Sequence, residues 1–300
     1  MSGSPGSRPP ICGVTVTYHP GRAWAGRLRA IVAETARTVI VDNGSGGDEL
    51  EAVRHRARES GSQLISNERN LGLAGALNQG VRWAFSQGFR FALLFDQDSA
   101  PGPGIAAELL RVHGLAESRA PIAVVGSNYF DDRQGCVRFP SVAGEVSGWL
   151  VWNTVIVSGS LVERETFERL GGFREEFFVD FVDHDYCLRA RGAGFSVVLA
   201  TRPLMVHSIG DVTVRRFLGR RVVTTNHSPE RRYSMTRNLV ILARRYWLKE
   251  PNWVARSLLD LARHALVMLA VEDRRSAKLR AIGRGVLHGL RGTIGPRSPG

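Results

Sequence analysis

The first two hundred residues alternate short apolar runs with amphipathic segments. Short apolar runs predict strands, as at Ile11–Tyr18, which is rich in β-branched residues, and at Phe89–Phe95. Between such runs, apolar residues recur at helical spacing, as along Leu73–Gln87. Strands that alternate with helices form βαβ units. This part of the chain therefore predicts an α/β fold in which helices flank a mostly parallel sheet.

The pattern becomes helical beyond about Asp211, and one apolar stripe there runs along Val254–Met268. We therefore expect three regions: a disordered tail at 1–10, an α/β domain at 11–210 and a basic helical region at 211–300. No stretch reaches the roughly 18 uncharged apolar residues that a spanning helix needs. We expect the stripe to pack on the α/β domain, and the alternative is that it docks on lipid.

Polar residues directly follow several predicted strands: His19, Asp42, Asn70, Asp96 and Asp98. In open parallel sheets ligands bind at the carboxyl ends of the strands, so these residues are candidates for a binding site. Asp96 and Asp98 are hard oxygen donors one residue apart, which suits Mg²⁺ or Mn²⁺ held between the protein and a diphosphate. The alternative for each cluster is an ordinary solvated turn.

Four further segments carry candidate chemistry. Asn70–Gly80 opens a predicted helix with small residues that favour a bound anion, but it lacks the glycine patterns of dehydrogenases and P-loop NTPases. Phe178–Arg189 places three Asp among aromatic residues, which favours a general base; an acidic helix start is the alternative. His207 is a candidate metal ligand, although a lone His is more often none. Arg231–Asn238 suits phosphate contacts or a solvated basic face.

The charge of the chain is unevenly distributed. Its formal net charge is +12, and residues 201–300 hold 20 Lys and Arg against 6 Asp and Glu. A basic region of this kind suits a nucleic acid, an anionic membrane surface or a phosphorylated substrate. The region has no zinc-finger, RRM or KH signature, which weighs against nucleic acid. Three widely spaced Cys favour a reducing cytoplasm over a disulfide framework.

The order of these motifs is more specific than any one of them. The series resembles that of family 2 glycosyltransferases, and most of all their bacterial rhamnosyltransferase branch, which uses dTDP-L-rhamnose. The likeness extends over about residues 11–245. It rests on the segments Thr17–Pro20, Val41–Ser45, Asn70–Gly72, Ala76–Gly80, Asp96–Ser99, Ser158–Ser160, Gly171–Phe173, Val182–Arg189 and Thr236–Asn238.

The resemblance implies a GT-A, Rossmann-like fold, a divalent metal (Mg²⁺ or Mn²⁺) and a set of site residues. It implies nucleotide contacts for Thr17, Tyr18, Asp42, Asn70 and Asn78. It places Asp96 near the ribose and the metal, makes Asp98 the main metal ligand, and lets His207 reach the metal or the diphosphate. Asp183 falls where the family has its catalytic base, with Asp185 beside it. Arg237 and Asn238 would close over the diphosphate or the acceptor.

These expectations define a metal-assisted, inverting single displacement in which one Asp deprotonates the acceptor hydroxyl. The expected donor is dTDP-rhamnose, and the expected acceptor is a cell-surface glycan or a lipid-linked glycan. The expected location is the cytoplasm, with peripheral contact on the inner face of the membrane as an option. A UDP-sugar transferase such as a galactofuranosyltransferase is the main alternative. A nucleic-acid-binding protein and a catalytically inactive scaffold are more remote ones.

The chain departs from the family pattern at two positions. Val182 precedes Asp183 where the family commonly has Glu, and Ser234 stands where the branch often has Tyr. Neither departure removes a carboxylate, so the expected activity stands, but both weaken the assignment of the sugar.

Overall fold

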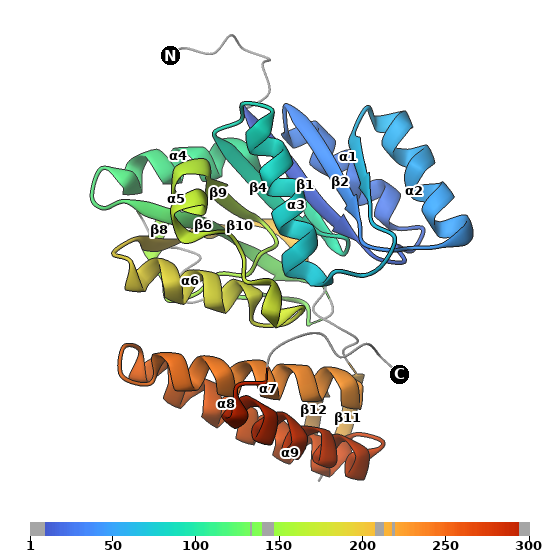
Figure 1. Cartoon of the computed structure of the whole chain (residues 1–300), viewed down its shortest axis with the longest axis vertical. Coiled ribbons are helices and arrows are strands. Elements are labelled where there is room, and N and C mark those ends of the chain that lie inside the picture. The colour runs from blue at the N-terminus through green and yellow to red at the C-terminus, as the bar shows by residue number, and fades with distance from the viewer. Residues whose placement is uncertain (1–9, 133, 140–146, 208–212, 218–219, 294–300) are drawn as a thin grey trace. The chain divides into compact units, whose positions relative to one another are not determined.

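The computed structural model describes residues 10–132, 134–139, 147–207, 213–217 and 220–293 (Figure 1). The chain divides into two compact units. The catalytic unit comprises Met1–Glu175 and Val182–Ser208, and the helical unit comprises Glu176–Phe181 and Ile209–Gly300. The expected boundary at Gly210 and the expected tail, up to residue 9, lie outside the described residues.

A ten-stranded sheet forms the centre of the catalytic unit, with its main strands in the order β3-β2-β1-β4-β9-β6-β10-β5. Four neighbouring strands run parallel: β3 (Gln63–Ser66), β2 (Arg37–Asp42), β1 (Ile11–Thr17) and β4 (Phe91–Asp96). The register aligns Thr17 with Asp42, and Val16 with Asp96. The carboxyl ends of these strands therefore meet at one edge of the sheet, as the sequence predicts.

The other half of the sheet is mixed. β9 (Ser160–Glu163) runs antiparallel between β4 and β6 (Ile122–Asp131), and β10 (Ser196–His207) lies parallel to β6. The short strands β5 (Ser99–Pro101) and β8 (Trp149–Val151) pair antiparallel with β10, and β7 (Cys136–Val137) pairs with β6. The apolar run Leu150–Val157 predicts a further strand, and only its start, Leu150 and Val151, lies in one.

Helices cover both faces of the parallel half. These helices are α1 (Trp24–Glu34), α2 (Gly47–Ser60) and α3 (Gly72–Ser86). A Cβ on Gly13 would meet Ile31 of α1, whereas Val14 next to it lies against Gly80 of α3. Successive residues of β1 thus face opposite helices, and all seven residues of the strand are buried. Burial on both faces explains why the strand is almost uniformly apolar.

Three more helices complete the catalytic unit: α4 (Ile105–Glu117), α5 (Arg164–Leu170) and α6 (Val182–Gly192). A 3-10 turn at Glu175–Phe177 precedes α6. Gly171, in the left-handed conformation at φ 76°, ends α5. The glycine pair Gly171-Gly172 after the helical pattern of Glu163–Leu170 predicts this stop, and the structure confirms it.

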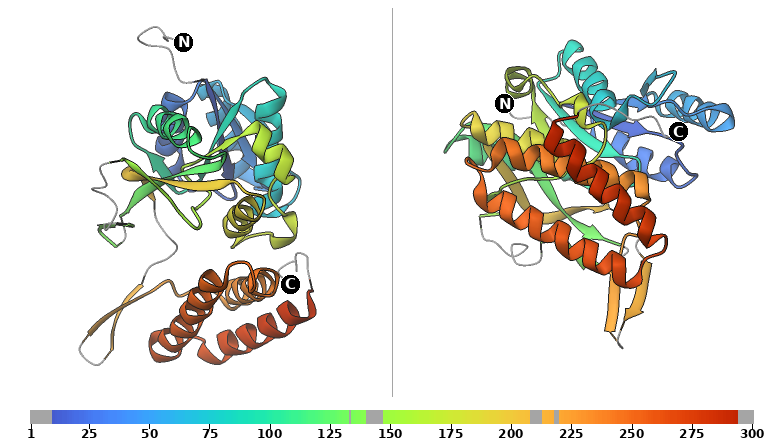
Figure 2. Two further views of the ribbon diagram at one scale, coloured as in Figure 1. Left: turned by 90° about the vertical axis from the view of Figure 1, so that its left-hand side faces the viewer. Right: turned by 60° about the horizontal axis from the view of Figure 1, so that its bottom comes forward.

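The helical unit contains α7 (Pro229–Tyr246), α8 (Pro251–Val271) and α9 (Arg275–Arg291), and α7 and α9 run side by side (Figure 2). The hairpin of β11 (Thr213–Phe217) and β12 (Arg220–Thr224) precedes α7 and lies against α8. The sequence pattern missed this hairpin. Glu272, buried at 2 % exposure, pairs with Arg232 at 2.6 Å and Lys278 at 2.8 Å.

The expected stripe on α8 packs inside the helical unit itself. Val254 and Met268 are buried, and the helix lies against α7, α9 and the hairpin. Leu258, which belongs to the same stripe, is exposed. Among the described residues, no helix combines the length and the apolarity needed to cross a membrane.

Candidate active site

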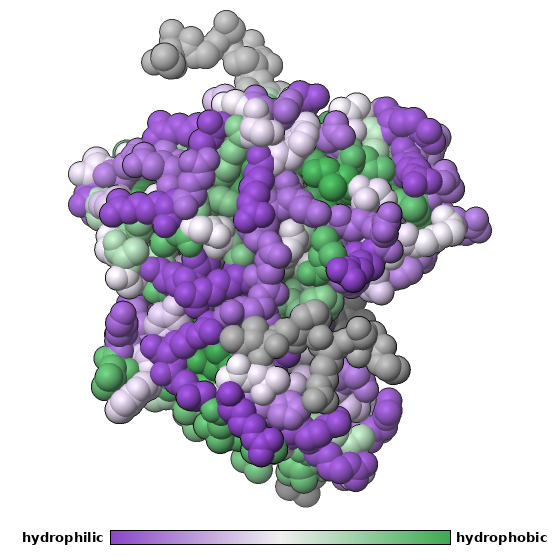
Figure 3. Space-filling model, in the orientation of Figure 1, coloured by the Kyte–Doolittle hydropathy of each residue, from purple (hydrophilic) through white to green (hydrophobic). Residues whose placement is uncertain are grey.

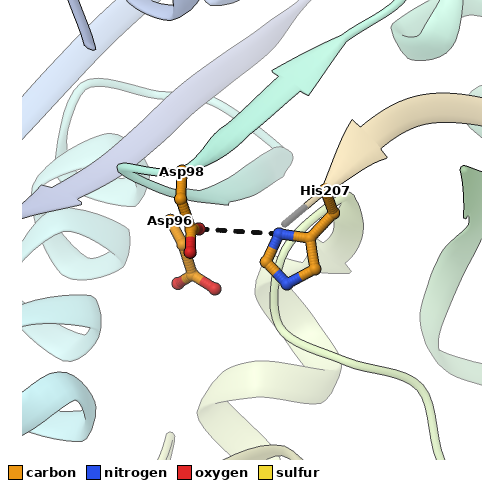
Figure 4. A group of neighbouring side chains, drawn as sticks. All are labelled: Asp96, Asp98 and His207. Carbon is orange, nitrogen blue, oxygen red and sulfur yellow. Dashed lines mark ion pairs between the residues drawn. The ribbon is translucent and has the colours of Figure 1, made fainter. Parts of the chain in front are cut away.

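Three side chains that are distant in sequence meet at the carboxyl edge of the sheet (Figure 4). Asp96 ends β4, Asp98 lies in the turn that follows, and His207 ends β10. One ligand atom from each residue lies within 4.8 Å of the other two. Asp98 Oδ1 is 3.5 Å from His207 Nδ1. The predicted metal ligands are thus brought together by the fold.

This group fits a divalent cation. Asp98 Oδ1 is buried and accepts no hydrogen bond from the described residues, which leaves it available as a ligand. Burial lowers the pKa of His207, and the nearby carboxylates of Asp98, Asp131 and Asp132 oppose this shift only in part. A neutral imidazole with two carboxylates is a donor set that suits Mn²⁺ or Mg²⁺.

Two buried serines hold the imidazole. Ser99 Oγ lies 2.7 Å from His207 Nδ1, and the Ser158 hydroxyl donates to Ser99 Oγ at 2.6 Å. The backbone amide of Asp96 donates to Ser158 Oγ at 3.1 Å. This chain links two of the expected ligands through groups that sequence reasoning missed. In the sequence, Ser99 and Ser158 are marked only by lying in two of the segments that resemble the family, Asp96–Ser99 and Ser158–Ser160.

A second polar cluster joins β1 and β2. The Asp42 carboxylate is fully buried and accepts from the Thr17 hydroxyl at 3.0 Å. It also accepts from the hydroxyl and the amide of Ser45, at 2.8 and 2.9 Å. Tyr18 is 44 % exposed, and its amide donates to the side-chain oxygen of Gln97 at 2.8 Å. Thr17, Tyr18 and Asp42 therefore lie beside the metal-ligand turn, and their contact with a nucleotide stays a prediction.

The side chains of Asn70 and Asn78 both form hydrogen bonds with backbone groups. Asn70 Oδ1 accepts from Asn43 at 2.9 Å and from the amide of Gly72 at 2.8 Å, at the start of α3. Asn78 is 1 % exposed and donates to the carbonyl of Phe173 at 2.8 Å and to Glu175 at 2.9 Å. These bonds give both residues a structural role, and their nucleotide contact is untested.

The two acidic residues at the start of α6 have different surroundings. Asp185 is fully buried and pairs with Arg174 at 3.2 Å and Arg189 at 2.7 Å. Asp183 is half-buried, accepts from the amide of His184 at 2.8 Å, and has no cationic partner among the described residues. An acceptor hydroxyl can reach a partly exposed carboxylate but not one that is enclosed by two guanidinium groups, so the geometry favours Asp183 over Asp185 as the base.

Arg237 and Asn238 lie on α7 and are 3 % and 0 % exposed. Arg237 donates to Asn238 Oδ1 at 2.9 Å, and its guanidinium lies over the ring of Tyr233. Asn238 Nδ2 contacts three backbone carbonyls of the segment that precedes α6. Within the helical unit both side chains have internal partners, and the expected contact of Arg237 with a diphosphate is untested.

A second group with metal-like composition lies elsewhere in the catalytic unit and consists of His113, Glu117 and Glu163. Arg90 Nε pairs with Glu163 at 2.6 Å, and another nitrogen of this guanidinium lies 3.6 Å from Glu117. The guanidinium already supplies the positive charge that the two carboxylates need. We therefore interpret this group as an ion-pair network.

Known proteins of similar sequence are glycosyltransferases. The model of glycosyl transferase family 2 matches residues 27–132. The dTDP-rhamnosyl transferase RfbF of Shigella flexneri is 28% identical over 304 residues, which cover 95% of this chain and 97% of that protein.

Solved structures share the fold at low sequence identity. The mannosyltransferase PcManGT from Pyrobaculum calidifontis, in complex with GDP-Man and Mn²⁺, aligns with a TM-score of 0.57 at 17% identity, over 97% of this chain and 90% of its own. S. aureus TarS 1-349 in complex with UDP-GlcNAc aligns with a TM-score of 0.53 at 14% identity, over 94% and 92%. The chain is thus a glycosyltransferase that matches family 2 over residues 27–132, shares the fold of a solved mannosyltransferase, and has a group of side chains able to hold a metal ion.

Proposed function

We propose that the protein transfers L-rhamnose from dTDP-rhamnose to a hydroxyl of a glycan or lipid-linked acceptor, with inversion at the anomeric carbon. The observation that carries the donor assignment is the relation to a dTDP-rhamnosyl transferase, which extends over 95% of the chain. The approach of Asp96, Asp98 and His207 to one another supports the metal-assisted mechanism.

In the proposed mechanism, Asp96, Asp98 and His207 hold a divalent cation. When bound, the cation neutralises the charge that develops on the leaving diphosphate. Asp183 accepts the proton of the acceptor hydroxyl, whose oxygen attacks the anomeric carbon as the bond to the diphosphate breaks. Thr17 and Asp42 position the nucleotide, with Tyr18, Asn70 and Asn78 lining the same pocket. We also retain the expectation that Arg237 reaches the diphosphate or the acceptor when substrate binds.

Calorimetry with dTDP, UDP and GDP, each in Mn²⁺, Mg²⁺ or EDTA, tests donor and metal together. We expect dTDP to bind best, and EDTA to weaken its binding tenfold or more, by roughly 1.4 kcal/mol. Asp98→Asn should weaken binding similarly. Asp260→Asn, an exposed position on α8, is the matched control and should bind as wild type.

Each opposite result in this experiment has a clear meaning. Preference for UDP would move the donor to a UDP-sugar, with galactofuranose first. Equal binding in EDTA and in Mn²⁺ would contradict the metal role of Asp96, Asp98 and His207. Absence of binding to all three nucleotides would contradict the proposed donor class.

We propose further that the helical unit contacts the anionic cytoplasmic face of the membrane. Leu258, Leu259, Leu266 and Leu269 form an α8 apolar face and are 42%, 69%, 69% and 39% exposed. Figure 3 shows hydrophobic surface on this part of the helical unit. Arg256 and Arg263 border the face on the helix. An exposed apolar face with a basic border is typical of helices that lie on anionic lipid.

A further inference from the structure

The segment that leads into α6 is strained. Phe178, Asp180 and Phe181 have φ values of 59°, 55° and 66°, in the left-handed region that residues with a Cβ rarely adopt. The segment ends at Val182, where α6 begins, and Asp183 is the next residue. Such strain persists only where surrounding contacts impose it, and it is concentrated at functional sites. The contacts that hold this segment are therefore informative.

One side chain makes three of these contacts. Asn238 Nδ2 lies 2.9 Å from the carbonyl oxygens of Phe177 and Val179 and 3.0 Å from that of Asp180. Asn238 is fully buried on α7. Because the three carbonyls converge on one amide nitrogen, Asn238 fixes the path of the backbone through the strained residues.

A neighbouring arginine fixes the orientation of that amide. Arg237 Nε and Nη2 donate to Asn238 Oδ1 at 3.1 and 2.9 Å. With Oδ1 bound to a guanidinium, the Nδ2 end must face the segment. Arg231 adds a second connection, because its guanidinium lies 3.1 Å from Asp180 Oδ1. The Thr236–Asn238 element thus holds residues 177–180 within the helical unit.

We propose that Asn238 is a positioning residue for Asp183. It holds the strained segment in the conformation that sets where α6 begins, and thereby the place of the Asp183 carboxylate. Further along α6, Asp185 is fixed by Arg174 and Arg189, so the helix is held on both sides of the reactive carboxylate. The inference rests on the proposed role of Asp183 as the base. It differs from the role that family resemblance implies, in which Asn238 contacts the diphosphate or the acceptor.

We call the three hydrogen bonds from Asn238 Nδ2 to the carbonyls of residues 177, 179 and 180 the clamp. Two substitutions in the full chain test it. Asn238→Asp keeps the size of the side chain and its bond to Arg237 but removes both N–H donors, and Asn238→Ala removes the whole group. Tyr233→Phe, on the same helix as Asn238, is the matched control, because it removes a hydroxyl that lies 2.8 Å from His288 Nδ1 of α9 and keeps the amide of Asn238. Thermal melting of each variant reports any general loss of stability.

The first readout is hydrogen exchange of the amides in residues 176–183, which needs no activity. We expect exchange there to rise at least tenfold in both Asn238 variants and to stay within twofold of wild type in Tyr233→Phe. Unchanged exchange in the Asn238 variants would overturn the clamp, whatever the enzyme transfers.

The second readout is turnover, measured as dTDP release from dTDP-rhamnose with water as the acceptor. We expect kcat of Asn238→Asp to fall about a hundredfold, which is typical when a reacting group is displaced by 1 Å. The KM for the donor and the affinity for dTDP with Mn²⁺ should stay within threefold. A parallel loss of donor affinity would instead assign Asn238 to direct ligand contact. A wild-type enzyme without turnover would contradict the proposed donor, and the exchange experiment would still decide on the clamp.

Discussion

At the scale of single residues, the surroundings of His207 decide how it can bind a metal ion. An imidazole has two nitrogens, and Ser99 Oγ occupies Nδ1 at 2.7 Å. A hydrogen bond at Nδ1 leaves Nε2 to act as the ligand and fixes the ring, as second-shell partners of metal-binding His commonly do. Ser158 donates to Ser99 Oγ, and the amide of Asp96 donates in turn to Ser158 Oγ. The two serines therefore belong to the metal site although neither is a ligand.

We predict that Ser99→Ala weakens Mn²⁺ binding about tenfold, which is the lower end of the usual effect of second-shell changes. The measurement is a Mn²⁺ titration followed by electron paramagnetic resonance, without nucleotide. Ser118→Ala is the control, because this exposed hydroxyl bonds only the carbonyl of Leu115. Equal Mn²⁺ affinity in Ser99→Ala and wild type would show that Ser99 and Ser158 do not support the metal site.

Residue identity alone could not separate Asp183 from Asp185. Both follow the same aromatic run, and they stand two positions apart. What separates them is the pairing of Asp185 with Arg174 and Arg189, and Arg174 lies 11 positions away in a different local structure. The same holds for Ser158, whose partner Ser99 lies 59 residues earlier. Long-range partners of this kind depend on the sheet order, which no local pattern specifies.

At the scale of elements, the parallel half of the sheet could be predicted because β1, β2 and β4 are apolar and almost fully buried, and because a helix follows each of β1, β2 and β3. The mixed half could not be predicted. β9 and β5 have four and three residues, too few to show a period, and β9 runs against its neighbours. The hairpin before α7 was missed for a similar reason, because strands of five residues in an Arg-rich segment lack the apolar alternation of a typical strand.

The contact of α3 with the sheet depends on a glycine. A Cβ on Gly80 would lie 2.4 Å from Val14 Cγ1 and 3.1 Å from Val41 Cγ2. We predict that Gly80→Ala destabilises the protein by about 1–3 kcal/mol, the usual cost of overpacking a core. Unfolding in urea measures the change.

Gly283 provides the matched control for this prediction. It also lies within a helix, α9, but a Cβ there would meet nothing within 4 Å. Gly283→Ala should therefore stabilise the protein by about 0.5–1 kcal/mol, because alanine loses less backbone entropy in a helix. Loss of stability in both variants would mean that close packing is not the reason for Gly80.

At the scale of the whole molecule, the charge asymmetry in the sequence corresponds to the two units of the fold. The acidic groups of the candidate site lie on the catalytic unit, and the basic excess lies largely on the helical unit. The apolar period of Val254–Met268 predicts a stripe packed on the α/β domain, whereas Val254 and Met268 of this stripe are buried against other elements of the helical unit. Leu258 of the same stripe is exposed and forms an apolar face with Leu259, Leu266 and Leu269, which the period did not predict.

This α8 apolar face, Leu258, Leu259, Leu266 and Leu269, supports the last prediction. We expect the full chain to co-sediment at physiological salt with vesicles rich in phosphatidylglycerol, and not with phosphatidylcholine vesicles. Burial of each leucine contributes on the order of 1–2 kcal/mol, and each arginine near the surface about 1 kcal/mol. The double variant Leu259→Gln with Leu266→Gln should thus bind at least about tenfold more weakly.

Leu115→Gln on α4 is the control for this variant, because Leu115 is also exposed, at 47%, but lies on the catalytic unit. It should bind vesicles as wild type does. If the double variant bound vesicles as tightly as wild type, the apolar face of α8 would not contribute and charge alone would account for binding. Self-association that the double variant abolishes, without vesicle binding, would assign the face to a second copy of the chain. We expect lipid instead, because a symmetric pairing of α8 would bring like-charged Arg256 and Arg263 borders together.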